Sequence, residues 1–245
     1  MSRRYLTPAQ SDEAERQLQT WRINPRRCPV CRADPDDYEA VAAATDHHCG
    51  RELSRLFHQA TAGLNPRHMA FDWDTATPTP ITRAVNRYLE NFDDHVRDGK
   101  GLVFLAANYG SGKTQALVQI VKHALDHGYS GRDARMISFH DVISSYQRED
   151  ADAFERELHS AKILAIDEII VPKSEPQAIL FERFADVVDA RYVANRPIFL
   201  AGNISPHDLE RHYPKVFSRL HSMVDLIEVP DLDFRQHERR SEANA

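Results

Sequence analysis

Two glycines, a lysine and a threonine lie close together in the run from Ala107 to Thr114. Gly110 and Gly112 allow the backbone to curl so that several N–H groups face one anion, and the N-terminus of a following helix adds partial positive charge. Lys113 can then reach the outer phosphates of a nucleotide, and the threonine hydroxyl can ligate Mg²⁺. The spacing therefore predicts a phosphate-binding loop.

This loop departs from the usual G-x-x-x-x-G-K-[ST] pattern at one place, because Ala107 stands where the first glycine is expected. That position ends a strand, where alanine can be tolerated. A chance glycine turn before a helix is the competing interpretation, but an apolar strand precedes the loop and a helix, Lys113–Asp126, follows it. The residues that we expect to contact the nucleotide are Asn108, Tyr109, Gly110, Ser111, Gly112, Lys113, Thr114 and Gln115.

Two carboxylates end the second informative run, KILAIDEI at Lys162–Ile169. Its apolar residues predict a buried strand, which we expect to lie beside the strand that precedes the phosphate loop. Asp167 then lies near the Mg²⁺ ion, usually through water, and Glu168 polarises the attacking water. An acidic turn after a strand is the alternative, and the phosphate loop upstream favours the catalytic interpretation.

A third apolar run, Pro197–Asn203, predicts another buried strand with an amide at its tip. The Asn203 amide can hydrogen-bond a γ-phosphate or the attacking water, whereas a plain turn before Ser205 is the alternative. Ligands of parallel sheets bind at the carboxyl ends of the strands. Ala107, Asp167 and Asn203 are all predicted at such ends, and we therefore expect them to converge.

The cysteines of the chain number three, and all lie between Cys28 and Cys49, which favours a metal site over disulfides. Two thiolates in a C-x-x-C turn can bind one tetrahedral zinc ion. Such an ion can contribute of order 10 kcal/mol to the folding of a small module. We predict the ligands Cys28, Cys31, His47 and Cys49, with His48 as the open alternative to His47 and Asp46, His58 and His68 as more distant candidates. Three buried thiols with surface histidines are the competing interpretation.

Alternating strands and helices are needed to position these residues. Helices are predicted over residues 51–62, 81–98, 113–126, 141–147, 151–159, 175–194, 206–213 and 215–221, and strands before the phosphate loop and over 135–140, 162–169, 197–203 and 224–229. We expect Asp141 to cap the helix over 141–147. The alternation indicates an α/β fold with a parallel sheet and right-handed crossovers.

The length of 245 residues suits one α/β domain plus a small module. We expect the module at residues 1–62, a Pro- and Thr-rich linker at 63–80, the α/β domain at 81–235 and a polar tail at 236–245. Mean hydropathy is -0.55, and there is neither a secretory signal nor a run long enough to span a bilayer, so we expect a cytoplasmic protein without a membrane partner. The net charge of -6 does not point to nucleic acid, nor does it exclude a basic groove.

From Gly63 to Arg235 the sequence resembles the AAA+ ATPases of the DnaC, DnaI and IstB group, which are bacterial helicase loaders and transposition ATPases. The resemblance rests on the segments GLNPRHMAF, NYGSGKT, ILAIDEI, DARYVANRPIFLAGN and FSRL, with DFR near the end. It implies a three-layer P-loop NTPase domain with a central parallel sheet, preceded by a small, mostly helical zinc-binding module. The implied cofactors are ATP, Mg²⁺ and Zn²⁺.

The resemblance also implies residue roles. Lys113 and Thr114 match Walker A, Asp167 and Glu168 match Walker B, and Asn203 matches sensor 1. Arg219 matches the arginine finger, which acts on ATP bound by a neighbouring copy and therefore implies a homo-oligomer. A surface arginine on a short helix is the alternative for that residue, and the role of Arg235 stays open.

The implied function is that of an ATPase that loads a replicative DNA helicase onto single-stranded DNA. The N-terminal module, which resembles that of DnaI, is expected to dock the helicase. Tyr146, Arg148 and Arg156 are weak candidates for DNA contact. One alternative is an IstB-like transposition ATPase that binds duplex DNA and a transposase, and another is a nucleotide-dependent scaffold without catalysis. Ala107 in Walker A indicates slow hydrolysis.

Overall fold

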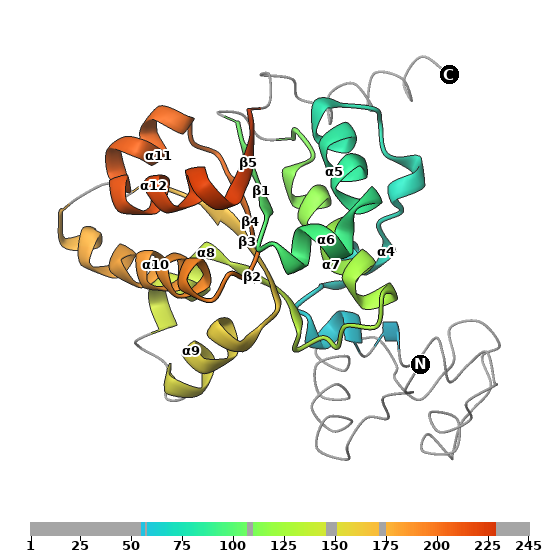
Figure 1. Cartoon of the computed structure of the whole chain (residues 1–245), viewed down its shortest axis with the longest axis horizontal. Helices are drawn as coiled ribbons and strands as arrows, with labels where there is room; N and C mark the ends of the chain where they lie inside the picture. Colours follow the sequence, from blue (N-terminus) through green and yellow to red (C-terminus); the bar gives the residue numbers. More distant parts are fainter. Residues whose placement is uncertain (1–54, 57, 107–109, 146–150, 172–174, 229–245) are drawn as a thin grey trace.

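The computed structural model describes residues 55–56, 58–106, 110–145, 151–171 and 175–228, whose arrangement is drawn in Figure 1. Within these residues one sheet contains the parallel strands β1 (Gly101–Leu105), β2 (Ala134–Ser138), β3 (Ile163–Ile169), β4 (Ile198–Gly202) and β5 (Val224–Glu228). Their order across the sheet is β2-β3-β4-β1-β5. The α/β class and the parallel sheet are as the alternation of elements predicted.

The neighbour predicted for β3 is wrong. We expected it beside β1, but β4 lies between the two strands and pairs with both of them. Phe104 of β1 is in register with Ala201, and Ile166 of β3 is in register with Leu200. The run IFLAG of β4 is buried along its whole length, as befits a strand covered on both faces. A continuous apolar run in the sequence predicts that a strand is internal to the sheet. It does not predict which strands lie on either side of it.

Helices cover both faces of the sheet, as Figure 1 shows. One face carries α4 (Pro66–Ala70), α5 (Pro80–Glu90), α6 (Phe92–Arg97) and α7 (Lys113–Asp126), and a short 3-10 helix, η1 (Trp73–Thr75), connects α4 with α5. The other face carries α8 (Phe139–Ser144), α9 (Ala151–Ser160), α10 (Glu175–Val193), α11 (Pro206–His212) and α12 (Pro214–Met223). Successive strand residues point to opposite faces, so Phe104 joins the α7 core and Val103 joins the α10 core. The result is the predicted three-layer domain.

Two of the predicted helices differ from those in the structure, one in its length and one in its N-terminal cap. The helix predicted over 81–98 is two helices, because Asn91 leaves the helical conformation (φ -124°, ψ 34°) and ends α5 before α6 begins. Asn competes with the backbone for hydrogen bonds and so favours helix ends. The cap of α8 is Ser138 rather than Asp141, since the backbone N–H of Asp141 donates to the Ser138 hydroxyl at 3.1 Å.

Residues 58–64 cover the outer edge of β2. The backbone N–H of Met136 donates to the Ala62 carbonyl at 2.7 Å, and the Arg135 guanidinium donates to the Thr61 carbonyl at 2.5 Å. Gly63 has a φ of 89°, and a Cβ there would lie 2.2 Å from the Met136 carbonyl oxygen, so only glycine fits. The edge strand is thereby paired by the chain that precedes the sheet.

The segment predicted as a linker, residues 63–80, contains α4 and η1. Leu64 is fully buried, and the Lys122 ammonium on α7 donates to the carbonyls of Met69 (2.9 Å) and Phe71 (2.6 Å). This segment therefore packs on the α7 face. The domain boundary at residue 62 stays a prediction.

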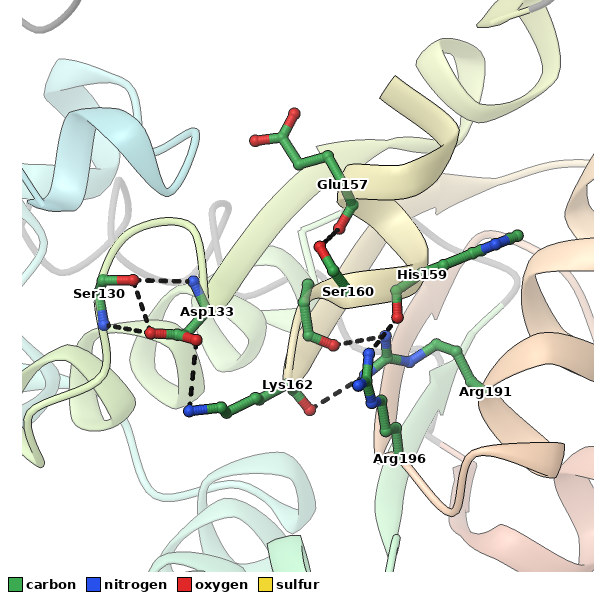
Figure 2. A network of polar contacts seen from close by, with 9 residues as sticks. Ser130, Asp133, Glu157, His159, Ser160, Lys162, Arg191 and Arg196 are labelled. Carbon is green, nitrogen blue, oxygen red and sulfur yellow. Dashed lines mark hydrogen bonds and ion pairs between the residues drawn. The ribbon is translucent and has the colours of Figure 1, made fainter. Parts of the chain in front are cut away.

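The buried Arg191 side chain connects α9 with β3 and β4 at the end of the sheet where these strands begin. Figure 2 shows this side chain beside Lys162. Arg191 of α10 is 1% exposed, and burial, with a smaller effect of the nearby Arg196 charge, lowers its pKa to about 9. Its guanidinium donates to the carbonyls of Leu158 (3.2 Å), Ala161 (3.0 Å), Lys162 (3.1 Å) and Pro197 (2.6 and 3.0 Å). The end of α9 and the starts of β3 and β4 are thus held by one side chain.

Across the described ranges, the helices all lack the combination of length and apolarity that crossing a bilayer requires.

Candidate nucleotide-binding site

The carboxyl ends of β1, β3 and β4 lie at one edge of the sheet. Gly202 of β4 is in register with Leu105 on one side and with Ile169 on the other, and the Ala106 N–H donates to the Gly202 carbonyl at 3.2 Å. The structure therefore brings the start of the loop, the Asp167–Glu168 pair and Asn203 to the same edge. Ala107, Asn108 and Tyr109 lie outside the described residues.

Two glycines shape the described part of the loop. Gly110 (φ 81°) and Gly112 (φ 86°) occupy the left-handed region, and Gly112 directly precedes α7 without capping it by a side chain. The first amides of α7 therefore remain available to an anion. Lys113 is 7% exposed, and its ammonium donates to the Ser111 hydroxyl at 2.8 Å. A buried ammonium beside such amides suits a phosphate group.

Asp167 links β3 to the start of α7. It is hydrogen-bonded to the Thr114 side chain, and the Glu168 N–H donates to its carboxylate at 2.8 Å. Burial raises the pKa of Asp167, while these two bonds and the nearby Lys113 charge act in the opposite direction. Adjacent carboxylate and hydroxyl oxygens are hard ligands of the kind that Mg²⁺ prefers. These two side chains therefore fit the predicted magnesium ligands.

Glu168 interrupts the regular strand. Its φ is 61°, a left-handed value that costs a non-glycine residue about 1 kcal/mol, and the pairing with β4 is irregular between Ile166 and Ile169. As a result Glu168 is exposed while Ile169 returns to the core. The distortion places an exposed carboxylate directly after the half-buried Asp167.

Asn203 directly follows β4. Its Oδ1 atom is buried and lacks a hydrogen-bond partner among the described residues. Leaving a buried acceptor unpaired costs about 1–3 kcal/mol, so such an atom is expected to serve a ligand or water. An O–H of a water molecule is a suitable donor to this oxygen.

Arg219 lies apart from this edge. It belongs to α12, on the face of the sheet opposite to α7 (Figure 1). Its Nε donates to Asp189 Oδ1 at 2.9 Å, and its guanidinium carbon lies 4.8 Å from the centre of the Tyr192 ring. The structure therefore brings the other described site residues together and does not bring Arg219 to them.

Several predicted residues lie outside the described part of the chain. These are the zinc candidates Cys28, Cys31, His47, His48 and Cys49, together with Tyr146, Arg148 and Arg235. Two of the distant zinc candidates have other roles: His58 Nδ1 accepts from the Gly131 N–H at 3.3 Å, and His68 forms the N-terminal cap of α4 with Asn65. A search of the described residues finds no group of three His, Cys, Asp or Glu side chains that could hold a metal ion.

No motif in the sequence pointed to the residues that contact Arg219. Asp189 and Tyr192 are ordinary helix residues that face Arg219 only after α10 packs on α12. The Tyr213 hydroxyl, which donates to the Ile170 carbonyl at 2.7 Å just beyond Glu168, was equally unforeseen. Each contact depends on tertiary packing between elements far apart in sequence.

Sequence comparisons find chromosomal replication initiator proteins, and no family model matches the chain. DnaA of Methylobacillus flagellatus is 26% identical over 188 residues, which are 71% of this chain and 37% of that protein. DnaA of Bordetella petrii is 30% identical over 140 residues, which are 54% of this chain and 28% of that protein. The chain thus spans about a third of the length of these relatives.

Solved structures match the same region. DnaI has a TM-score of 0.56 at 18% identity, covering 67% of this chain and 94% of that chain. The DnaC helicase loader has a TM-score of 0.56 at 19% identity, covering 67% and 99%. AMPPCP-bound DnaA from Aquifex aeolicus has a TM-score of 0.52 at 20% identity, covering 67% and 50%. At these identities the likeness establishes the fold alone: the described part of this chain has the fold of the DnaI, DnaC and DnaA structures.

Proposed function

We propose that this chain is an ATPase that loads a replicative DNA helicase onto single-stranded DNA. The observation that carries the ATPase assignment is the meeting of Thr114, Asp167 and Asn203 at the strand edge beside the buried Lys113. A structure of the same fold, that of DnaA from Aquifex aeolicus, contains the ATP analogue AMPPCP. The likeness to the DnaC helicase loader supports the choice of partner.

The residues divide the work of phosphoryl transfer. Lys113 and the amides at the start of α7 bind the outer phosphates, while Thr114 and Asp167 would hold Mg²⁺. A bound Mg²⁺ ion neutralises charge that develops on the phosphates. Glu168 accepts a proton from the attacking water, and the Asn203 amide oxygen fixes that water by accepting its second hydrogen bond.

Arg219 acts on a neighbouring copy in this proposal. Since it lies on the opposite face of the sheet from α7, the ATP that it contacts is bound by another copy of the chain. A guanidinium delivered in this way stabilises the transferring phosphoryl group and can raise turnover by roughly 10³–10⁵. The complete site is therefore shared between two copies.

The docking module of the proposal is residues 1–62, held by zinc on Cys28, Cys31, His47 and Cys49. Zinc content per chain, measured by atomic emission on tag-free protein, tests the metal assignment. We expect about one zinc per chain, lost when Cys28 and Cys31 are both replaced by Ser. A purified chain without zinc contradicts this part of the proposal and leaves the ATPase domain unaffected.

A loading assay on circular single-stranded DNA tests the proposed function. The replicative helicase from the same source is mixed with the full chain, ATP and closed circular DNA, and helicase that co-elutes with the DNA is measured. We expect loading to require the chain and to fail with Lys113→Ala, because a closed helicase ring must be opened to enter a circle. Loading that proceeds equally without the chain contradicts the proposal.

The same preparation distinguishes the alternative function. An IstB-like transposition ATPase forms an ATP-dependent complex on duplex DNA and has no contact with the helicase. Binding to the helicase can be measured with immobilised full-length chain, and duplex binding by filter retention at several salt concentrations. Duplex binding without helicase binding would replace helicase loading by the transposition role.

A further inference from the structure

Arg219 is held by its inner nitrogen. The Nε–H donates to Asp189 Oδ1 at 2.9 Å, with the two side chains 47% and 52% exposed. Among the described residues, neither terminal nitrogen of this guanidinium has a hydrogen-bond or ion-pair partner. The two-pronged end of the side chain, which is the part that matches a phosphate group, therefore stays free.

A second contact comes from the same helix. Tyr192 lies three residues after Asp189 on α10, and its ring centre is 4.8 Å from the Arg219 guanidinium carbon. The ring is 42% exposed, although aromatic rings are more often buried. The Asp189 carboxylate holds the Nε atom of Arg219, and the Tyr192 ring packs against its guanidinium group. Together these contacts restrict a side chain that otherwise samples many rotamers.

We propose that Asp189 and Tyr192 are positioning residues, which hold Arg219 in the conformation that contacts ATP bound by the neighbouring copy. This inference rests on the proposed action of Arg219 between copies. An exposed, unrestrained arginine loses rotamer freedom when it binds a phosphate, and this loss weakens binding. An arginine that is already held by residues of α10 does not incur this entropic cost on binding. A carboxylate that sequestered Arg219 would instead pair with the terminal nitrogens, which Asp189 does not.

Mixed assemblies separate the copy that supplies Arg219 from the copy that uses it. The supplying chain carries Glu168→Gln, which keeps its phosphate loop and removes its own turnover. The receiving chain carries Arg219→Ala and keeps an intact ATP site. Each chain alone is expected to be nearly inactive, and mixing should restore ATPase at interfaces where the supplying chain presents Arg219. A tag on one chain verifies by pull-down that mixed assemblies form.

Asp189→Asn is then placed in one chain at a time. In the supplying chain we expect the restored kcat to fall by roughly 3- to 10-fold, and in the receiving chain we expect no change. Tyr192→Ala in the supplying chain should act in the same direction, and Tyr192→Phe, which keeps the ring, should not. Asp186→Asn is the matched control, since it removes the same charge from an exposed position of α10 whose carboxylate is neither a hydrogen-bond nor an ion-pair partner of Arg219 among the described residues.

Each outcome decides a different point. If Asp189→Asn slows turnover equally from either chain, it acts on stability, and the positioning role is wrong. If it slows turnover from neither chain, or raises it from the supplying chain, the positioning role is also wrong. If mixed assemblies form but the supplying chain without further changes restores no activity, the action of Arg219 between copies fails, and this inference fails with it.

Discussion

Asn203 and Glu168 each have a locally unfavourable feature that their proposed roles would explain. Asn203 keeps a buried amide oxygen without a partner among the described residues, and Glu168 adopts a left-handed backbone conformation. Each feature costs about 1 kcal/mol or more, and such costs gather at functional positions. We therefore expect substitutions here to change turnover more than stability.

Three substitutions should separate binding from turnover. Lys113→Ala removes the ammonium that we propose binds the phosphates and should weaken ATP binding at least about 10-fold. Glu168→Gln should keep ATP affinity within about 3-fold and lower kcat by roughly 10²–10³, because it removes the base. Asn203→Ala should lower kcat by roughly 10- to 100-fold without lowering Tm, since it also removes an unpaired buried oxygen.

Titration with a fluorescent ATP analogue and steady-state phosphate release measure the two quantities. Full helicase loading by Glu168→Gln, together with its loss in Lys113→Ala, would support a scaffold that binds ATP without needing turnover. A drop in Tm for Asn203→Ala would show that its amide oxygen has a structural partner.

The elements at the other end of the sheet depend on Arg191. Its five hydrogen bonds go to carbonyl groups of α9 and of the segments that enter β3 and β4, and Figure 2 shows Arg191 beside Lys162. β3, which contains Asp167, and β4, which precedes Asn203, are therefore both held by the Arg191 side chain where they begin. A planar guanidinium can serve several carbonyls at once, which a lysine ammonium cannot do in the same geometry.

Arg191→Lys should therefore lower the free energy of unfolding by about 2 kcal/mol, because it leaves buried carbonyls unpaired. Arg183→Lys is the control on the same helix: its guanidinium pairs with Glu155 at 3.6 Å with both side chains about two-fifths exposed, and it should cost less than about 0.5 kcal/mol. Urea unfolding followed by circular dichroism measures both. Equal midpoints for the two variants would contradict the anchoring role.

Local patterns in the sequence were enough to predict the glycine turn before α7, α7 itself and the buried strands. Each depends on neighbouring residues, such as Gly112 before Lys113 or the apolar run before Asp167. The position of β4 between β1 and β3 could not be predicted in this way, because strand order is decided by how crossover helices pack. The contacts of Arg219 with Asp189 and Tyr192 were hidden for the same reason.

Acid should destabilise the whole domain through two histidines on the α7 face. Burial and the nearby Lys122 charge lower the pKa of His68, and burial and the nearby His127 charge lower the pKa of His123, both from an ordinary 6.5. Above that value both histidines are neutral, whether the chain is folded or unfolded. As pH falls below it, the unfolded chain binds protons that the folded chain resists, so stability declines until the folded-state pKa is passed.

Thermal unfolding from about pH 7.5 to about pH 5.5 tests this expectation. Tm should fall with pH, and His68→Gln combined with His123→Gln should reduce the slope, because neither glutamine can be protonated. His207→Gln, at an exposed position of α11, is the matched control and should retain the slope. An unchanged slope in the double variant would assign the acid sensitivity to other groups.

The strap of residues 58–64 along β2 has a practical consequence for any shortened form of this protein. A chain that began at Ile81 would leave the Met136 N–H and the rest of that strand edge unpaired, and an exposed edge is a template for pairing with other chains. We expect such a chain to aggregate, whereas one that keeps residues 55–80 should stay monodisperse. That result would place residues 58–64 in the folding unit of the α/β domain, where they protect the edge of β2 from pairing with other chains.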